Sequence, residues 1–64
     1  MENYNYIIRV EADGKIPMMF PHCGNFNQVS IAASNMMDTL GFTKAEIWST
    51  HEFKIIAAIL KIEQ

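Results

Sequence analysis

Two side chains that can do chemistry stand next to each other in a short loop sequence. His22 and Cys23 lie within the segment Pro-His-Cys-Gly-Asn, just before a predicted helix. A helix N-terminus and a neighbouring imidazolium both favour the thiolate form of cysteine, which is the reactive form. This arrangement predicts one candidate function, a minimal thiol- or metal-dependent site, which His51 could complete across a dimer.

The same residues fit a structural role better. Adjacent side chains in an extended loop point apart, no second cysteine is present, and no acid is placed to orient the histidine. A metal site needs three or four converging ligands, and the chain has no C-x-x-C or H-x-x-x-H spacing. We therefore expect Cys23 to be a small buried hydrophobic side chain, and we expect no enzyme activity, cofactor or metal ion.

Length and composition indicate one small folded domain over residues 1–64, half of them hydrophobic. A domain of this size buries about 60% of its unfolded surface, and self-association is a common source of extra stability. The single cysteine and the lack of a signal-peptide pattern predict a cytoplasmic protein. The longest apolar run, residues 55–60, is far shorter than the roughly 20 residues of a membrane span.

The charges argue against a nucleic-acid partner. The net charge is −2, from five basic and seven acidic residues, and the basic residues are scattered singly along the chain. Tyr4, Trp48 and Phe53 could stack on bases, but single-stranded nucleic acid also requires a basic groove.

Two strands joined by a tight turn are predicted at the start of the chain. Residues 4–11 alternate between two faces and are rich in β-branched and aromatic side chains. Asp13 and Gly14 then form a strong hairpin signal before a return strand over residues 16–20. Pro17 lacks a backbone N–H, so this second strand should lie at the edge of a sheet.

A helix should follow, with recognisable signals at both ends. The sequence from Asn25 to Gln28 fits a variant capping box, with Asn25 or Asn27 as the N-cap. Apolar residues then recur at three- and four-residue spacing over residues 29–40, and Gly41 stands where a left-handed C-cap belongs.

The end of the chain adds residues 44–50 and residues 53–62, both interpreted as strands. The last stretch is apolar on both faces, which is typical of a strand buried on both sides. The resulting fold is α+β, β-β-α-β-β, a mainly antiparallel four-stranded sheet with one helix on one face. Ser49 and Glu52 also fit a capping box, so a helical last element is the alternative.

One helix covers one face of such a sheet, which leaves the second apolar face for a partner. Uninterrupted alternation places six residues on the uncovered face: Ile7, Met19, Trp48, Phe53, Ile55 and Ile59. It turns another eight toward the helix: Tyr6, Ile8, Ile16, Met18, Ile47, Ile56, Ala58 and Leu60. A register slip of one residue would exchange the two sets.

The favoured function is a non-enzymatic protein-interaction module. It would form a homodimer, or dock on a larger host or cellular protein, through the uncovered face. Strand addition at the edge containing Pro17 is a weaker variant, because proline blunts that edge. One compact domain without tails is also the format of accessory or inhibitor proteins of phages and mobile elements, an association of format alone.

Overall fold

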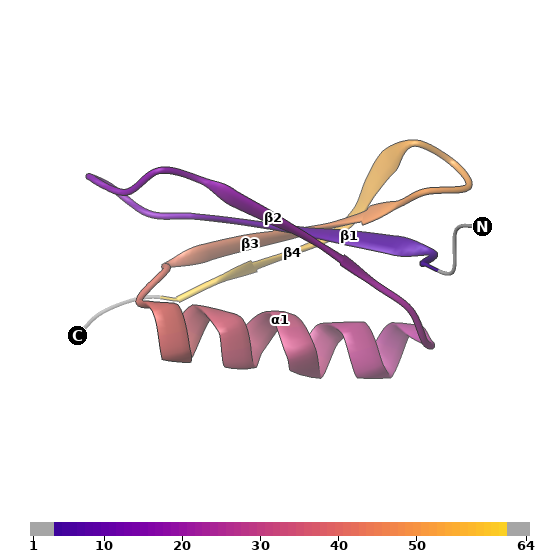
Figure 1. Cartoon of the computed structure of the whole chain (residues 1–64), viewed down its shortest axis with the longest axis horizontal. Coiled ribbons are helices and arrows are strands. Elements are labelled where there is room, and N and C mark those ends of the chain that lie inside the picture. The colour runs from indigo at the N-terminus through magenta and orange to yellow at the C-terminus, as the bar shows by residue number, and fades with distance from the viewer. Residues whose placement is uncertain (1–3, 62–64) are drawn as a thin grey trace.

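The computed structural model describes residues 4–61, which form four strands and one helix. In chain order these are β1 (Tyr6–Glu11), β2 (Met18–His22), α1 (Phe26–Leu40), β3 (Lys44–Ser49) and β4 (Lys54–Leu60). The strands make one antiparallel sheet in the order β2-β1-β3-β4, and α1 lies across one face of it (Figure 1). The predicted α+β fold is confirmed, and the helical alternative for the last element is wrong. Position 62 lies outside the described residues.

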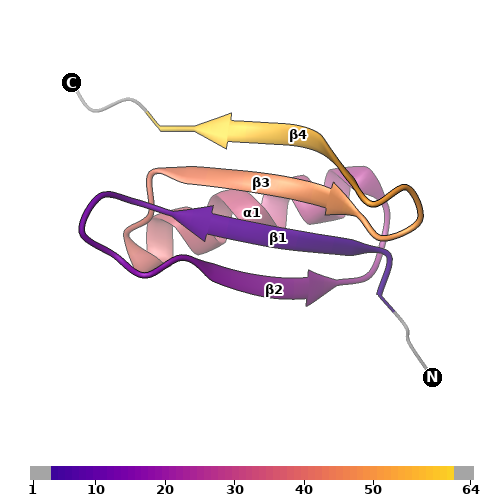
Figure 2. The same cartoon turned by 90° about the horizontal axis from the view of Figure 1, so that it is seen from above.

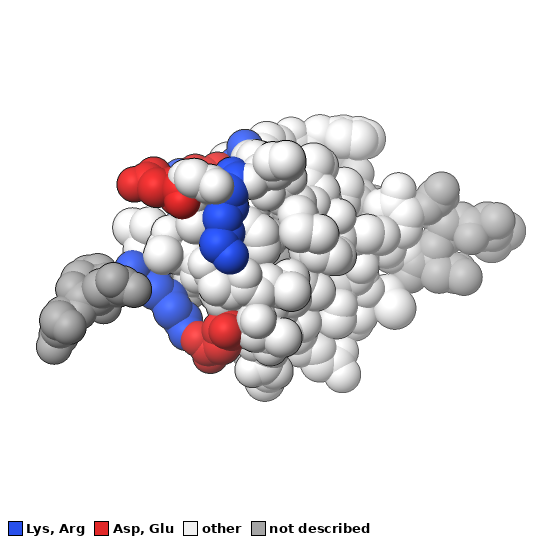
Figure 3. All heavy atoms as spheres, turned by 60° about the vertical axis from the view of Figure 1, so that its left-hand side comes forward, with Lys and Arg blue, Asp and Glu red and all other residues white. Residues whose placement is uncertain are grey.

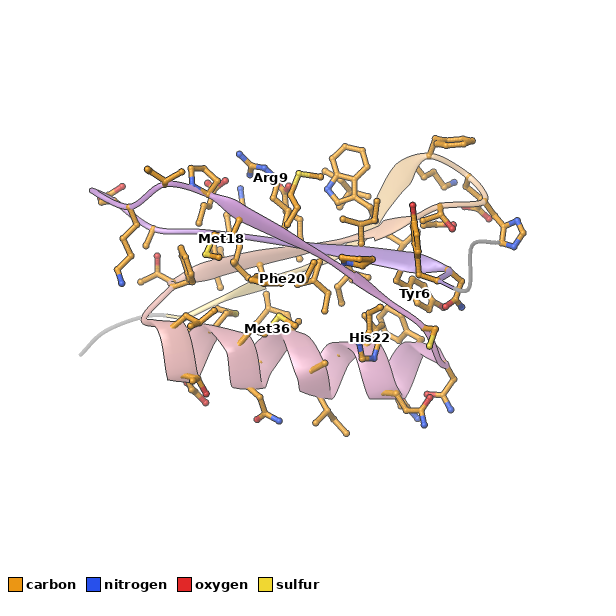
Figure 4. All side chains as sticks on the ribbon, viewed as in Figure 1. Tyr6, Arg9, Met18, Phe20, His22 and Met36 are labelled. Carbon is orange, nitrogen blue, oxygen red and sulfur yellow. The ribbon has the colours of Figure 1, made fainter. Side chains whose placement is uncertain are left out.

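The hydrophobic core lies between α1 and the two central strands, β1 and β3, beneath which the helix runs (Figure 2). Eight side chains there are at most 5% exposed: Ile8, Val10, Val29, Ala33, Met37, Phe42, Ala45 and Ile47. Phe20 from β2 and Met36 from α1 point into the same layer, whereas Arg9 points away from it (Figure 4). The opposite face of the sheet, here called the open face, has no element of the described chain across it.

The predicted helix caps are confirmed. The Asn25 side chain accepts a hydrogen bond from the Gln28 N–H at 2.8 Å, and the Gln28 side chain accepts one from the Asn25 N–H at 2.8 Å. At the other end Gly41 has φ +79° and donates its N–H to the Met37 carbonyl at 2.9 Å. Short polar side chains and glycine thus satisfy backbone groups that a helix leaves without partners at its ends.

The tip of the β1–β2 hairpin is tied to the C-terminus of α1. The Lys15 Nζ donates to the Leu40 carbonyl at 2.9 Å and lies 5.3 Å from the centroid of the Phe42 ring. The negative end of the helix dipole and the face of an aromatic ring both attract a cation. One lysine therefore connects the hairpin, the helix and the core.

The second strand is an edge strand, as predicted, but it begins and ends two residues later than the sequence indicates. Pro17 precedes β2, and Pro21 lies inside it, opposite Ile7 of β1. Ile16 therefore lies outside the strand and is 85% exposed, which corrects its predicted place beneath the helix. Met18 pairs with buried Val10 but is 43% exposed, because α1 packs mainly on β1 and β3.

A bulge in β4 overturns part of the predicted face assignment. Trp48 pairs with Ile55, but Ile47 pairs with Ala57, so Ile56 has no counterpart on β3. An extra residue in one strand shifts the alternation of every residue beyond it.

The shift moves Ile59 to the helix side, where it pairs with buried Ala45 and packs against the core. Its predicted place on the open face is therefore wrong. Ala58 and Leu60, predicted to face the helix, pair with Glu46 and Lys44 and lie on the open face.

Candidate functional site

A hollow of about 420 Å³ lies on the open face near the turn between β3 and β4. Its walls come from β1, β2, β3 and that turn, together with Tyr4 ahead of β1. The lining residues are Tyr4, Ile7, Arg9, Met19, Trp48, Ser49, Thr50 and Phe53. Most of this lining is apolar, so the hollow suits a hydrophobic side chain better than a charged one.

Strand pairing explains why three of the predicted interface residues meet in the hollow. Ile7 of β1 lies between Trp48 of β3 on one side and Pro21 of β2 on the other, and Met19 follows two positions along β2's open face. Met19 is 60% exposed, whereas Ile7 and Trp48 are half-buried. Ile55 pairs with Trp48 and lies beside the hollow on the same face.

Phe53 stands at the rim of the hollow in an unusual backbone conformation. Its φ is +55°, and no other non-glycine residue in the described part of the chain has a positive φ. The turn is held by the Phe53 N–H, which donates to the Ser49 carbonyl at 2.8 Å. This left-handed conformation costs a bulky residue roughly 1–2 kcal/mol, and glycine adopts it without that cost.

Packing of the Phe53 ring stabilises the fold little and does not offset this strain, because the residue is 83% exposed. Strained residues are concentrated at functional sites, where the surrounding structure holds them in place. An exposed aromatic ring held at the rim of an apolar hollow is therefore the strongest sign of function on this face.

Four charged residues continue along the open face from the edge of the hollow, where they neutralise each other. Arg9 forms ion pairs with Glu11 and, at 3.6 Å, with Glu46, and Lys44 lies 4.0 Å from Glu11 and 3.5 Å from Glu46. These four residues, the charge quartet, hold two positive and two negative charges. Glu46 also accepts a hydrogen bond from the Trp48 indole N–H at 3.4 Å.

The quartet leaves no surplus charge beside the hollow. Figure 3 shows charged side chains of both signs in small groups on a largely uncharged surface. Neither a polyanion nor a strongly basic segment would find a complementary field here. The site therefore favours an occupant that is mainly apolar.

The candidate thiol site is only partly assembled. His22 and Cys23 both line a second, shallow hollow beside α1, and Cys23 is exposed. His51 lies in the turn after β3 and does not line this hollow. Residues 4–61 contain no group of three or more His, Cys, Asp or Glu side chains that could hold a metal ion.

Polar groups in the loop before α1 serve to fix the loop. The Asn5 side-chain amide donates to the Gly24 carbonyl at 2.9 Å and accepts from the Gly24 N–H at 3.2 Å. Asn5 thus clamps the chain between β2 and the helix, next to Cys23. Cys23 itself is exposed beside a shallow hollow, so the expectation that it is a small buried side chain is wrong.

Sequence reasoning missed the polar part of the hollow and the whole quartet. The sequence does place charged residues two positions apart, Arg9 with Glu11 and Lys44 with Glu46, so that each pair lies on one face of its strand. The four charges form one cluster only because β1 lies beside β3, which brings Arg9 opposite Glu46. Strand order is a property of the fold that the spacing of residues does not contain.

No helix in the described part of the chain is both long and apolar enough to cross a membrane. No protein-family model, curated protein or solved structure matches the chain.

Proposed function

We propose that this chain is a non-enzymatic protein-interaction module whose open-face hollow receives an apolar segment of another protein. The observation that supports this proposal is Phe53, an exposed aromatic residue in a strained turn beside Trp48 and Met19. Packing of the ring within the chain does not offset this strain, whereas binding to a partner would bury the ring.

The composition of the hollow supports a protein as the partner. Tryptophan is enriched at the energetic centres of protein interfaces, and methionine adapts its shape to varied partners. The volume of about 420 Å³ lies within the range of about 300–1,000 Å³ that is usual for binding sites. An accessory or inhibitor protein that docks on a larger host or cellular protein fits this description.

The neutral charge quartet makes nucleic acid the weaker alternative. Tyr4, Trp48 and Phe53 all line the hollow, so the aromatic half of a base-stacking site is present. The cations of Arg9 and Lys44 are already engaged by Glu11 and Glu46, and single strands need free positive charge along their path.

The proposal is tested with a pair of variants matched in exposure. Met19, in the hollow, is 60% exposed, and Ile31, on the outer side of α1, is 62% exposed. The immobilised wild-type chain, Met19→Glu and Ile31→Glu are each incubated with an extract of the cells in which the protein occurs. A protein retained by the wild-type chain and Ile31→Glu, but lost with Met19→Glu, is the expected result. Equal retention by all three would contradict docking at the hollow.

The single tryptophan then reports binding directly, because it lies in the hollow. Titration of the purified partner should shift the emission of Trp48, and Phe53→Gly should weaken binding at least tenfold. A single-stranded oligonucleotide at low salt is the comparison ligand. A saturable emission change with the oligonucleotide, and none with any protein retained, would replace this proposal with the nucleic-acid alternative.

A further inference from the structure

We propose that two copies of this chain pair through the free edges of β4, antiparallel, to form one eight-stranded sheet with a two-fold axis at its centre. β4 is the outermost strand on its side of the sheet, with no other described element beyond it (Figure 2). This inference concerns the edge of the sheet and is independent of the function proposed for the hollow.

The two edges of the sheet differ in how they are protected. The β2 edge carries Pro21 inside the strand and Pro17 just before it, and proline prevents regular pairing. The β4 edge has the sequence KIIAAIL, with no proline and no acid, and its one charge stands at its first residue. A long apolar edge of this kind attracts another strand unless the assembled protein covers it.

The backbone groups of β4 point the right way for such pairing. The Lys61 N–H donates to the Thr43 carbonyl at 2.9 Å, in register with the pairs Ala45–Ile59 and Ile47–Ala57. Hydrogen-bonding direction alternates along an antiparallel strand. The N–H and C=O groups of the intervening residues, Ala58 and Leu60, therefore point to the free edge.

A second copy is the occupant that this edge fits. With Ala58 opposite Ala58 of the second copy, Ala57 lies opposite Ile59 and Ile56 lies opposite Leu60. Every one of these opposed pairs is apolar, and Lys61 lies opposite Ile55 rather than another lysine. Because positions 55–60 carry no charge, two copies meet there without repulsion, although each chain has a net charge of −2.

The protected β2 edge explains why pairing should stop at two copies. Pairing of β4 with β2 of another copy would repeat without limit and give a filament, whereas pairing of β4 with β4 closes on itself. Pro21 disfavours the first arrangement and leaves the second available.

The dimer should be weak. One edge strand from each copy is joined, so the buried area should fall below the about 1,600 Å² of a standard interface. We therefore expect a dissociation constant in the micromolar range.

The test is sedimentation equilibrium of the full chain from about 1 μM to about 1 mM, which brackets micromolar affinity. Leu60→Lys is compared with Ile31→Lys, since these side chains are 70% and 62% exposed and both variants should fold. We expect Leu60→Lys to raise the dissociation constant at least tenfold and Ile31→Lys to leave it unchanged. A wild-type chain that stays monomeric over the whole range would overturn the proposal.

A second pair of variants tests the backbone. Ala58→Pro removes an N–H that points out of the sheet, whereas Ala58→Ser keeps it with a side chain of similar size. Loss of the dimer with proline and its retention with serine is expected, and Leu60→Lys decides the matter if the proline variant fails to fold. A dimer that withstands Leu60→Lys but is lost with Met19→Glu would place the contact at the open face and refute pairing through β4. A monomeric chain that still binds a partner through Met19 would refute the proposed dimer and leave the function proposed for the hollow standing.

Discussion

At position 53 the chain places a bulky ring where the backbone favours glycine. The turn from Ser49 to Lys54 closes through the Phe53 N–H, with φ +55° at the last turn residue. In most turns of this kind glycine or asparagine supplies the positive φ. The backbone at this residue favours glycine, whereas the proposed binding needs the aromatic ring. A change to glycine should therefore weaken binding without lowering the free energy of unfolding.

Comparison of Phe53→Gly with Phe53→Ala isolates the backbone from the ring. Both variants remove the exposed ring, but alanine keeps the strain and glycine relieves it. Glycine also loses more chain entropy on folding, which offsets part of the relief. We expect the glycine variant to exceed the alanine variant by about 1 kcal/mol in free energy of unfolding, measured by urea denaturation. Equal stabilities would show that any strain relieved by glycine is no larger than the entropy that glycine costs.

At the scale of elements, local signals in the sequence placed the first turn and the helix, but β2 begins and ends two residues later than predicted. Asn25 and Gly41 mark the ends of α1 through local hydrogen bonds, which depend on neighbouring residues alone. The faces of β4 could not be predicted in the same way, because the bulge at Ile56 arises from pairing with β3. As a result, alternation placed Ile59 on the wrong face while placing Ile55 on the face where the structure has it.

The bulge makes a prediction about deletions. Removing Ile56 should leave Ile55 opposite Trp48 and Ala57 opposite Ile47, because Ile56 has no counterpart on β3. We expect this deletion to give a folded protein by circular dichroism and thermal melting. Deletion of Glu46 from β3, where no residue is spare, should turn Ala45 or Ile47 out of the core and unfold the chain. Loss of folding in the first variant would show that the bulge is required.

The link between hairpin and helix can be tested at Lys15. Lys15→Met keeps the length of the side chain but removes the cation from the Leu40 carbonyl and the Phe42 ring. We expect a loss of about 1 kcal/mol in free energy of unfolding, smaller at high salt. The control is Lys54→Met, which removes an exposed ion pair with Glu52 and should cost less than about 0.5 kcal/mol. Similar losses would indicate a general effect of charge.

At the scale of the molecule, residue patterns predicted the α+β class but not the order of the strands. That order brings Ile7, Met19 and Trp48 together from three strands, and it places β4 at an edge. The sequence indicated that an apolar surface would remain uncovered. It did not show that this surface is divided between a hollow, a charge quartet and a bare strand edge, because pairing between distant segments decides that division.

The edge-paired dimer has a consequence for the stability of the whole protein. A dimer that forms from folded chains alone makes unfolding depend on concentration. The melting temperature of the wild-type chain should rise by a few degrees for each tenfold increase in concentration above the dissociation constant. In the Leu60→Lys variant, as followed by calorimetry, the same rise should begin only at concentrations at least tenfold higher. A wild-type melting temperature that does not vary with concentration would contradict the dimer.

The central position of β1 and β3 also bears on how the chain reaches its native state. Each outer strand pairs with its neighbour in sequence, so both hairpins can close early through short connections. The β1–β3 pairing joins segments separated by the second strand and the helix, and such distant contacts slow folding. The two hairpins should therefore exist as separate halves until the helix brings them together. Before that step β1 and β3 are themselves free edges, so newly made chains should be most prone to mispair then.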